Sequence, residues 1–360
     1  MTLLSAYMVA VAQSTVRPVY KGLDGVFQPE CLTENLDRVC GLVEQAVKEF
    51  DAKLVVFPEY CLQGYSARRS IKDWERAGLL LPGREMSALA LVARKTGATI
   101  AGAAVERIPE FPGRYFMSGF MVGPDGTEPE DQLKLVYRKL YGLSAKTRPG
   151  DIQAPFVATF GRQSLFPVVD TPLGKIGCAI AGDVAMPEMV RGLALRGAEL
   201  VVVPAAATIS ADGPAPSIAA GQRLDPHHAT VRRVRAWENS IYLAYANIGP
   251  IIGDDNGVGP ERVPSEIVDY LGRVKARARS SQETIIATRV DMAALRRYRA
   301  DVRSNYLAQL QPALHASEYA GASTCPVNGF AERVHGDEQD VIDFISDSWQ
   351  AAIRAGRFNG

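Results

Sequence analysis

Two charged residues of this 360-residue chain follow short apolar runs that are typical of buried strands. Glu59 follows Pro58 after the run over residues 54–57, and Lys139 ends a second run that begins at residue 133. A buried carboxylate can act as a general base, best with a raised pKa, and a lysine can stabilise a developing oxyanion. Either residue alone is commonly a solvated strand end. The two residues have the types that acid–base and oxyanion chemistry would use, if the fold brings them together.

A strand-to-helix elbow at Ala181, Gly182 and Asp183 is where such a nucleophile would stand. The apolar run over residues 174–180 stops there, and Pro187 opens a helical pattern that a glycine closes at residue 197. Such an elbow exposes its first side chain and leaves backbone N–H groups free for an oxyanion. Alanine carries no nucleophilic group, so the elbow predicts a nucleophile position that lacks its nucleophile.

Four segments resemble, in their order, motifs of the nitrilase, or carbon–nitrogen hydrolase, superfamily. They are residues 54–60, residues 135–139, the elbow with its following Pro187 and Glu188, and residues 235–247. The resemblance implies that Glu59 is the general base, that Lys139 is the catalytic cation, and that the position of Ala181 belongs to a cysteine nucleophile.

The same resemblance implies the fold and the rest of the site. We expect an α+β four-layer α-β-β-α sandwich, which periodicity alone does not separate from a doubly wound sheet. Gly182, Asp183 and Tyr60 are expected at the oxyanion and substrate site. The implied activity is hydrolysis of a small-molecule amide or nitrile, and chemistry at a thiol requires no metal or organic cofactor.

The residues after the base indicate a branch of the superfamily. Residues 60–64 are similar to the segment after the catalytic glutamate in aliphatic amidases and formamidases, which also carry a long C-terminal extension ending near a Cys-Pro pair, as Cys325 and Pro326 do here. This resemblance implies a hydrolase domain over residues 1–300 and an extension over residues 301–360 that wraps a partner subunit in a homo-oligomer.

No other residue is a convincing replacement for the missing thiol. Cys178 lies three residues earlier on a strand and faces the side opposite Ala181. Cys61 would need a rearranged backbone to reach the same carbon. The chain departs from the family a second time, because the acid expected between the lysine and the elbow is missing until Asp151.

Three hypotheses therefore remain open. The chain is an engineered alanine variant of a cysteine enzyme, a natural pseudoenzyme that binds a ligand or partner, or an enzyme that uses Glu59 and Lys139 as acid and base without a covalent intermediate. A cysteine codon at position 181 of the gene would decide for the first. Outside this family, a generic α/β binding protein is the alternative, although the chain has neither a GxGxxG motif at the elbow nor a Walker-type phosphate loop.

Composition narrows the partners and the compartment. Lysine and arginine total 40, aspartate and glutamate also total 40, and no long charged run occurs, so nothing favours nucleic acid or an anionic membrane as a partner. No apolar stretch is long enough to span a bilayer. Five cysteines without regular spacing argue against a disulfide framework, so we expect a cytoplasmic protein.

The remaining periodicities predict the elements that carry the site. We expect helices over residues 33–50 with Thr33 as N-cap, 84–95 with Gly97 after its end, 226–239 and 337–354. Strands are expected over residues 99–105, 115–122, 164–170, 176–180, 200–203 and 242–247. Residues 266–268 and 284–290, with a turn around residues 271 and 272, resemble the closing hairpin of the nitrilase superfamily, so we expect a hairpin there. The loop over residues 208–222 is expected near the pocket, and His227 and His228 are expected to begin a helix.

Overall fold

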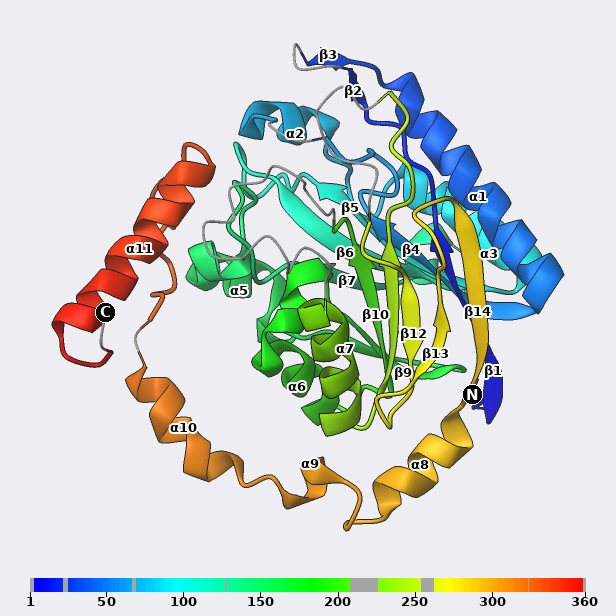
Figure 1. Cartoon of the computed structure of the whole chain (residues 1–360). Helices are drawn as coiled ribbons and strands as arrows, with labels where there is room; N and C mark the ends of the chain where they lie inside the picture. The colour runs from blue at the N-terminus through cyan, green and yellow to red at the C-terminus, as the bar shows by residue number, and fades with distance from the viewer. Residues whose placement is uncertain are drawn as a thin grey trace.

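The computed structural model describes residues 3–21, 25–66, 69–126, 128–207, 226–253, 262–322 and 324–358, and two six-stranded sheets dominate it (Figure 1). The first sheet has the spatial order β14 (Thr284–Asp291), β1 (Ala6–Gln13), β4 (Ala52–Glu59), β5 (Thr99–Glu106), β6 (Phe116–Val122) and β7 (Leu133–Arg138). The second has the order β13 (Val274–Arg277), β12 (Glu266–Val268), β11 (Tyr242–Asn247), β10 (Leu200–Ala205), β9 (Gly174–Cys178) and β8 (Val168–Thr171).

The two sheets pack face to face, and helices cover their outer sides. Strands β4 and β5 contact β10 and β11 across the interface. Helices α1 (Glu30–Phe50) and α3 (Arg84–Thr96) lie on the first sheet, while α6 (Pro187–Leu195) and α7 (Pro226–Glu238) lie beside the second. This arrangement confirms the predicted α-β-β-α sandwich.

Burial on both faces explains the apolar runs of the central strands. Every residue of β5 and β10 is buried, as expected of strands covered by a second sheet on one side and by helices on the other. Helix α1 instead buries one face only, with Val39, Leu42, Val43 and Ala46 at helical spacing. At the end of α3, Gly97 adopts φ 70°, the left-handed conformation that terminates helices.

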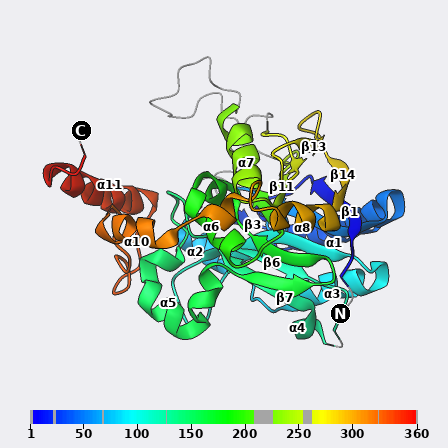
Figure 2. The ribbon, with the colours of Figure 1, turned by 90° about the horizontal axis from the view of Figure 1, so that it is seen from below.

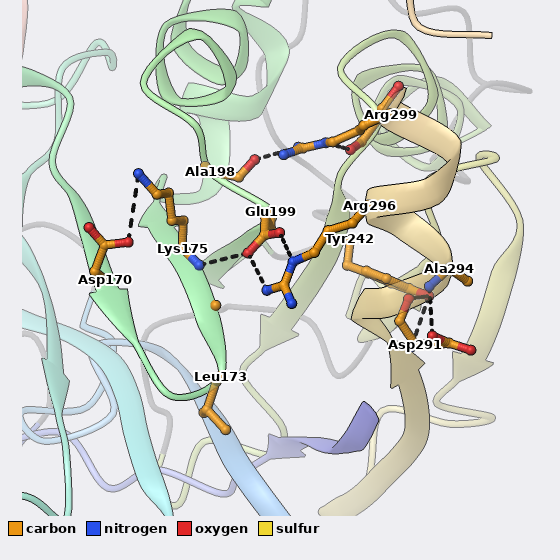
Figure 3. Close-up of polar contacts among 12 residues, drawn as sticks. Asp170, Leu173, Lys175, Ala198, Glu199, Tyr242, Asp291, Ala294, Arg296 and Arg299 are labelled. Carbon is orange, nitrogen blue, oxygen red and sulfur yellow. Dashed lines mark hydrogen bonds and ion pairs between the residues drawn. The ribbon is translucent and has the colours of Figure 1, made fainter. Parts of the chain in front are cut away.

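Arginines of α8 (Met292–Ala300) fasten this helix to the second sheet (Figure 3). The Arg296 guanidinium contacts both carboxylate oxygens of Glu199, at 2.6 and 3.0 Å, and the Lys175 backbone N–H donates to the same carboxylate. Arg299 donates to the carbonyls of Ala198 and Ser240. Helix α8 is therefore locked to the segments that enter β10 and β11.

The C-terminal extension follows α8 as an arc around the sandwich (Figure 1). It contains α9 (Tyr306–Gln309), α10 (Pro312–Gly321) and α11 (Glu338–Arg354), and in the view turned by 90° α11 projects furthest from the sheets (Figure 2). Helix α11 begins after Asp337, whose side chain accepts a hydrogen bond from the Asp340 backbone N–H, close to the predicted start.

The remaining described elements are β2 (Tyr20–Lys21), β3 (Val26–Phe27), α2 (Ile71–Ala77), α4 (Pro129–Gln132), α5 (Gln153–Phe160) and short 3₁₀ turns at Pro149–Ile152, Arg162–Leu165 and Ala181–Ala185. The predicted loop over residues 208–222 and the side chains of His227 and His228 lie outside what the structure describes. Among the described helices, none combines the length and the apolar character that crossing a membrane requires.

Three predictions of local structure were wrong. Helix α1 begins at Glu30 after Pro29, so Thr33 lies inside the helix and is not its N-cap, because Cys31 already packs into the core. The strand predicted from residue 164 begins at Val168, since a 3₁₀ turn precedes it.

The third error is the closing hairpin. Strand β12 pairs with β13, whereas β14 lies in the other sheet and pairs antiparallel with β1. Strand β13 is a largely exposed edge strand of four residues, in which Val274 and Ala276 alternate with Lys275 and Arg277. This alternation is too short to predict a strand from the sequence.

Candidate active site

Glu59 and Lys139 meet at the ends of two strands of the first sheet. Glu59 is the last residue of β4, and Lys139 follows β7 directly. The Lys139 ammonium lies 2.9 Å from Glu59 Oε1, and the lysine and glutamate side chains are 11% and 3% exposed. Burial raises the pKa of Glu59, but the ammonium groups of Lys139 and Lys146 outweigh it and hold that pKa below its usual value.

Lys146 is a site residue that the sequence reasoning missed. Its ammonium lies 3.4 Å from the same oxygen, Glu59 Oε1, and 5.3 Å from the centre of the Tyr60 ring, and its side chain is 15% exposed. The sequence held one signal for Lys146: the segment between Lys139 and Asp151 contains no acid, and Lys146 lies in that segment. A second cation therefore lies beside Glu59.

The elbow begins with a strained residue. Ala181 adopts φ 45°, a region that costs a non-glycine residue energy and that is found disproportionately at functional sites. Gly182 is exposed, and a Cβ placed on it would meet no atom within 4 Å. The elbow thus opens to free space at Gly182.

Asp183 ties the elbow to the lysine strand. Its carboxylate accepts hydrogen bonds from the Tyr137 hydroxyl at 2.8 Å and from the backbone N–H groups of Ile180 at 2.8 Å and Tyr141 at 3.0 Å. Burial raises its pKa to about 6, against the opposing effect of Lys139. Since Tyr137 lies two residues before Lys139, these bonds bring Lys139 to the elbow.

Sequence comparison decides the family. A model of the carbon–nitrogen hydrolase family matches residues 9–300. This chain belongs to that family. Omega-amidase NIT2 of Xenopus tropicalis is 28% identical over 271 residues, which cover 75% of this chain and 86% of the relative, and human omega-amidase NIT2 is 27% identical over 270 residues, covering 75% and 87%.

Solved structures share the family fold. Saccharomyces cerevisiae Nit3, a member of branch 10 of the nitrilase superfamily, superposes with a TM-score of 0.60 at 21% identity, covering 83% of this chain and 95% of that one. A variant of the amidase from Nesterenkonia sp. AN1 in which alanine replaces a cysteine superposes with a TM-score of 0.58 at 22% identity, covering 88% of this chain and 99% of that one.

Tyr60 directly follows Glu59 and has a strained backbone, with φ 61°. Its ring contacts Tyr65 and Trp74, with centroids 5.5 and 5.3 Å away, and it lies under the Lys146 ammonium. Burial and the nearby Glu59 carboxylate raise the pKa of its hydroxyl well above 10. The described contacts of Tyr60 therefore support Lys146, and a direct role in substrate binding stays a prediction.

Cys61 and Cys178, which the sequence analysis considered as replacement nucleophiles, are buried thiols of the core. Cys178 is fully buried beside Gly119, where an added Cβ would lie 2.5 Å from its sulfur, and burial raises its pKa well above 9. Burial also raises the pKa of Cys61 to about 12, and its sulfur lies 3.5 Å from the Ala103 carbonyl oxygen. A reactive thiol needs a lowered pKa and access.

The loop that carries Lys146 is held on both sides of that residue. The Ala145 carbonyl contacts His335 Nε2, and the Thr147 N–H donates to the Tyr115 carbonyl at 2.9 Å. Further along, Arg148 binds Asp151 through an ion pair at 2.6 Å. Because Asp151 is engaged in this way, it does not replace the family's missing acid.

A segment of the C-terminal extension, residues 328–335, completes this support, and we call it the clasp. The Asn328 and Phe330 N–H groups donate to the carbonyls of Gly150 and Asp151, at 2.8 and 3.0 Å, and the Phe330 side chain is fully buried. The clasp and the loop belong to the same chain. In the described residues, no group of three or more histidine, cysteine, aspartate or glutamate side chains is arranged to hold a metal ion.

Proposed function

We propose that this protein binds a small amide between Glu59, Lys139 and the elbow, on a scaffold whose hydrolytic step needs a cysteine at position 181. The observation that carries the proposal is the buried 2.9 Å contact between Lys139 and Glu59 beside the strained backbone of Ala181. The chain as it stands forms no acyl-enzyme at the elbow, because the alanine side chain has no lone pair to attack with.

The chemistry follows from the positions of the groups. With a thiol at 181, Glu59 would take its proton and the thiolate would attack the amide carbon. The Lys139 ammonium and the elbow N–H groups would stabilise the oxyanion, and protonated Glu59 would return the proton to the departing ammonia. Water would then hydrolyse the thioester. With Ala181, the first bond cannot form, so only binding and orientation of the amide remain.

The relatives support this reading. In a variant of the Nesterenkonia amidase with glutamine for a glutamate, the acetamide moiety of fluoroacetamide is added covalently at the active-site cysteine. A double variant of that amidase, with glutamine for a glutamate and alanine for a cysteine, is in complex with acrylamide. An alanine in place of that cysteine is therefore compatible with amide binding in that protein. Within the family, we assign this chain to the aliphatic amidase-like branch, on the segment after Glu59 and on the C-terminal extension.

A natural ligand-binding protein is the second candidate, and Lys146 is the observation that favours it. The ammonium groups of Lys139 and Lys146 lower the pKa of Glu59 and so make it a weaker base. An engineered exchange of cysteine for alanine at position 181 would not by itself have introduced Lys146. In this case Ala181 is the protein's own residue, and the site retains binding without turnover.

The test measures ammonia release and covalent labelling side by side. The unaltered chain should show neither turnover of amide and nitrile panels nor an acyl adduct by intact mass, and a stable adduct on Cys61 or Cys178 would overturn the assignment. Ala181→Cys should release ammonia from small amides if only the nucleophile is missing. If Ala181 is natural, the new thiol should react with iodoacetamide yet release no ammonia. An Ala181→Cys protein that does neither would contradict the site.

We further propose that the protein is a homo-oligomer and that α10 contacts a second copy. All ten residues of α10 lack burial in the single chain, and Leu314 and Tyr319 are among its exposed side chains. Because the clasp packs on its own chain, deletion of the whole extension would also disturb the site. Leu314→Glu is the narrower test, and it should lower the mass seen by light scattering. A wild-type protein that is monomeric at micromolar concentration would refute this proposal.

A further inference from the structure

The two ammonium groups at the site carry more hydrogen-bond donors than the chain satisfies. Lys139 and Lys146 have six N–H bonds between them, since each ammonium has three. Within the described part of the chain, their polar contacts are with one acceptor atom, Glu59 Oε1, at 2.9 and 3.4 Å. Both side chains are mostly removed from water, so the lost hydration is only partly replaced.

The neighbouring acids are already engaged. Asp183 accepts three hydrogen bonds, from Tyr137, Ile180 and Tyr141, and Asp151 is bound to Arg148. The Tyr60 ring lies under Lys146 and offers a cation a π face, which supplies no lone-pair acceptor. Among the described residues, these acids therefore offer the two ammonium groups no further oxygen, and an anionic ligand can supply oxygens in exchange for water.

The position of Lys146 is built into the fold. The residue before it is held by His335, the residue after it by the Tyr115 carbonyl, and the clasp anchors the loop beyond. A lysine on a free loop would turn to solvent, because a buried cation costs free energy. Here both neighbours of Lys146 are fixed, so its ammonium is held at the site.

We infer that Lys139 and Lys146 together bind the carboxylate group of a small organic anion in front of Ala181. This inference rests on the proposed function only in placing the ligand at the same site. Lys146 is the residue that we expect to favour a carboxylate over a neutral amide. Open space lies at Gly182, the residue directly after Ala181.

A carboxylate matches the site better than the alternatives do. Its two oxygens offer about four acceptor positions, enough to contact both ammonium groups at once. A neutral amide offers a single carbonyl oxygen and adds two donors of its own. A phosphate dianion would bring a second negative charge next to Glu59 and Asp183. The ligand class is thus a monocarboxylate, or a small amide that carries one carboxylate.

The test compares propionate with propionamide, two probes of nearly the same shape. Binding to the full-length wild-type chain is measured by ligand-observed NMR titration at pH 7 and constant ionic strength. Propionate should bind more tightly than propionamide. Lys146→Met should weaken propionate binding about tenfold or more, the effect of losing one charge-assisted hydrogen bond, and should leave propionamide binding unchanged. Equal binding of the two probes, or an unchanged propionate affinity in Lys146→Met, would overturn the inference.

Two further variants make the result specific. Lys175→Met removes a half-exposed lysine paired with Asp170 on the surface and should leave propionate affinity unchanged. Lys146→Arg keeps the charge and should retain most of the affinity, which separates recognition of the anion from a loss of folding. The outcome is independent of ammonia release by Ala181→Cys, so the inference and the proposed function can fail separately.

Discussion

Two pairs of a buried glutamate and a basic residue lie at neighbouring strand ends of one sheet. They differ in how many hydrogen-bond donors and acceptors remain without a partner in the pair. Glu106 ends β5 and pairs with Arg138, the last residue of β7, whereas Glu59 ends the adjacent β4 and pairs with Lys139. The two carboxylates are almost equally buried, at 2% and 3% exposed. Since their burial is alike, the difference lies in the cations and hydrogen-bond donors around each carboxylate.

The Arg138 guanidinium satisfies both oxygens of Glu106, at 2.6 and 2.8 Å, and the Ser118 hydroxyl adds a third contact. This pair is closed, as expected of a bidentate arginine. The lysines instead share one oxygen of Glu59 and keep spare donors. A lysine beside a buried acid thus leaves a site open to a ligand, whereas an arginine at the next position fastens the sheet.

The largest effect is expected from a change in the open pair, which is Glu59 with its two lysines. In the Ala181→Cys protein, Glu59→Gln should lower ammonia release by about 10³-fold or more, because the base and the nucleophile act as a unit. The assay is steady-state ammonia release from a small amide. Glu49→Gln, an exposed exchange on α1, is the control and should change nothing. A Glu59→Gln double variant that keeps activity within tenfold would show that Glu59 is not the base.

Breaking the closed pair should instead destabilise the protein. Glu106→Gln leaves the buried Arg138 guanidinium without its counter-charge, which typically costs about 3–5 kcal/mol. Urea denaturation should show this loss, and a smaller one for Glu59→Gln, because the lysine ammonium groups keep some contact with solvent. Equal losses in the two variants would mean that the pairs do not differ as described.

A third, smaller effect is on the pH dependence of stability. Asp183 has its pKa raised from 3.8 to about 6, so the folded state binds a proton that the unfolded state has released between those values. The contribution of Asp183 to stability is therefore present below about pH 4 and is lost as pH rises to about 6, by up to about 3 kcal/mol. Glu59, with its lowered pKa, acts in the opposite sense and loses its contribution as pH falls below its unfolded value.

Asp183→Asn isolates the first of these two contributions. Thermal unfolding of wild type and variant between pH 4 and 7 should show a stability difference that changes across this range. Curves that stay parallel would show that Asp183 titrates alike in the folded and unfolded states.

The sequence predicted the sandwich and the order of its elements because buried strands and covering helices leave apolar runs and caps. It could not assign β13, since this exposed edge strand has only four residues and its apolar alternation is too short to recognise. Nor could it predict the crossing of β14 into the first sheet, which depends on long-range pairing with β1. The convergence of Glu59, Lys139 and Asp183 followed from family motifs. Lys146 escaped notice because its place depends on a loop held by His335, 190 residues further along the chain from Ala145.

The most direct test of the central claim, that Lys139 and the elbow face each other, is the thiol pKa of the Ala181→Cys protein. The rate of iodoacetamide alkylation as a function of pH measures it. Two nearby ammonium groups should lower this pKa below the ordinary value of about 8.5, and Lys139→Met should raise it again. A pKa at or above about 8.5 that Lys139→Met does not change would place the lysine away from the elbow and contradict the account.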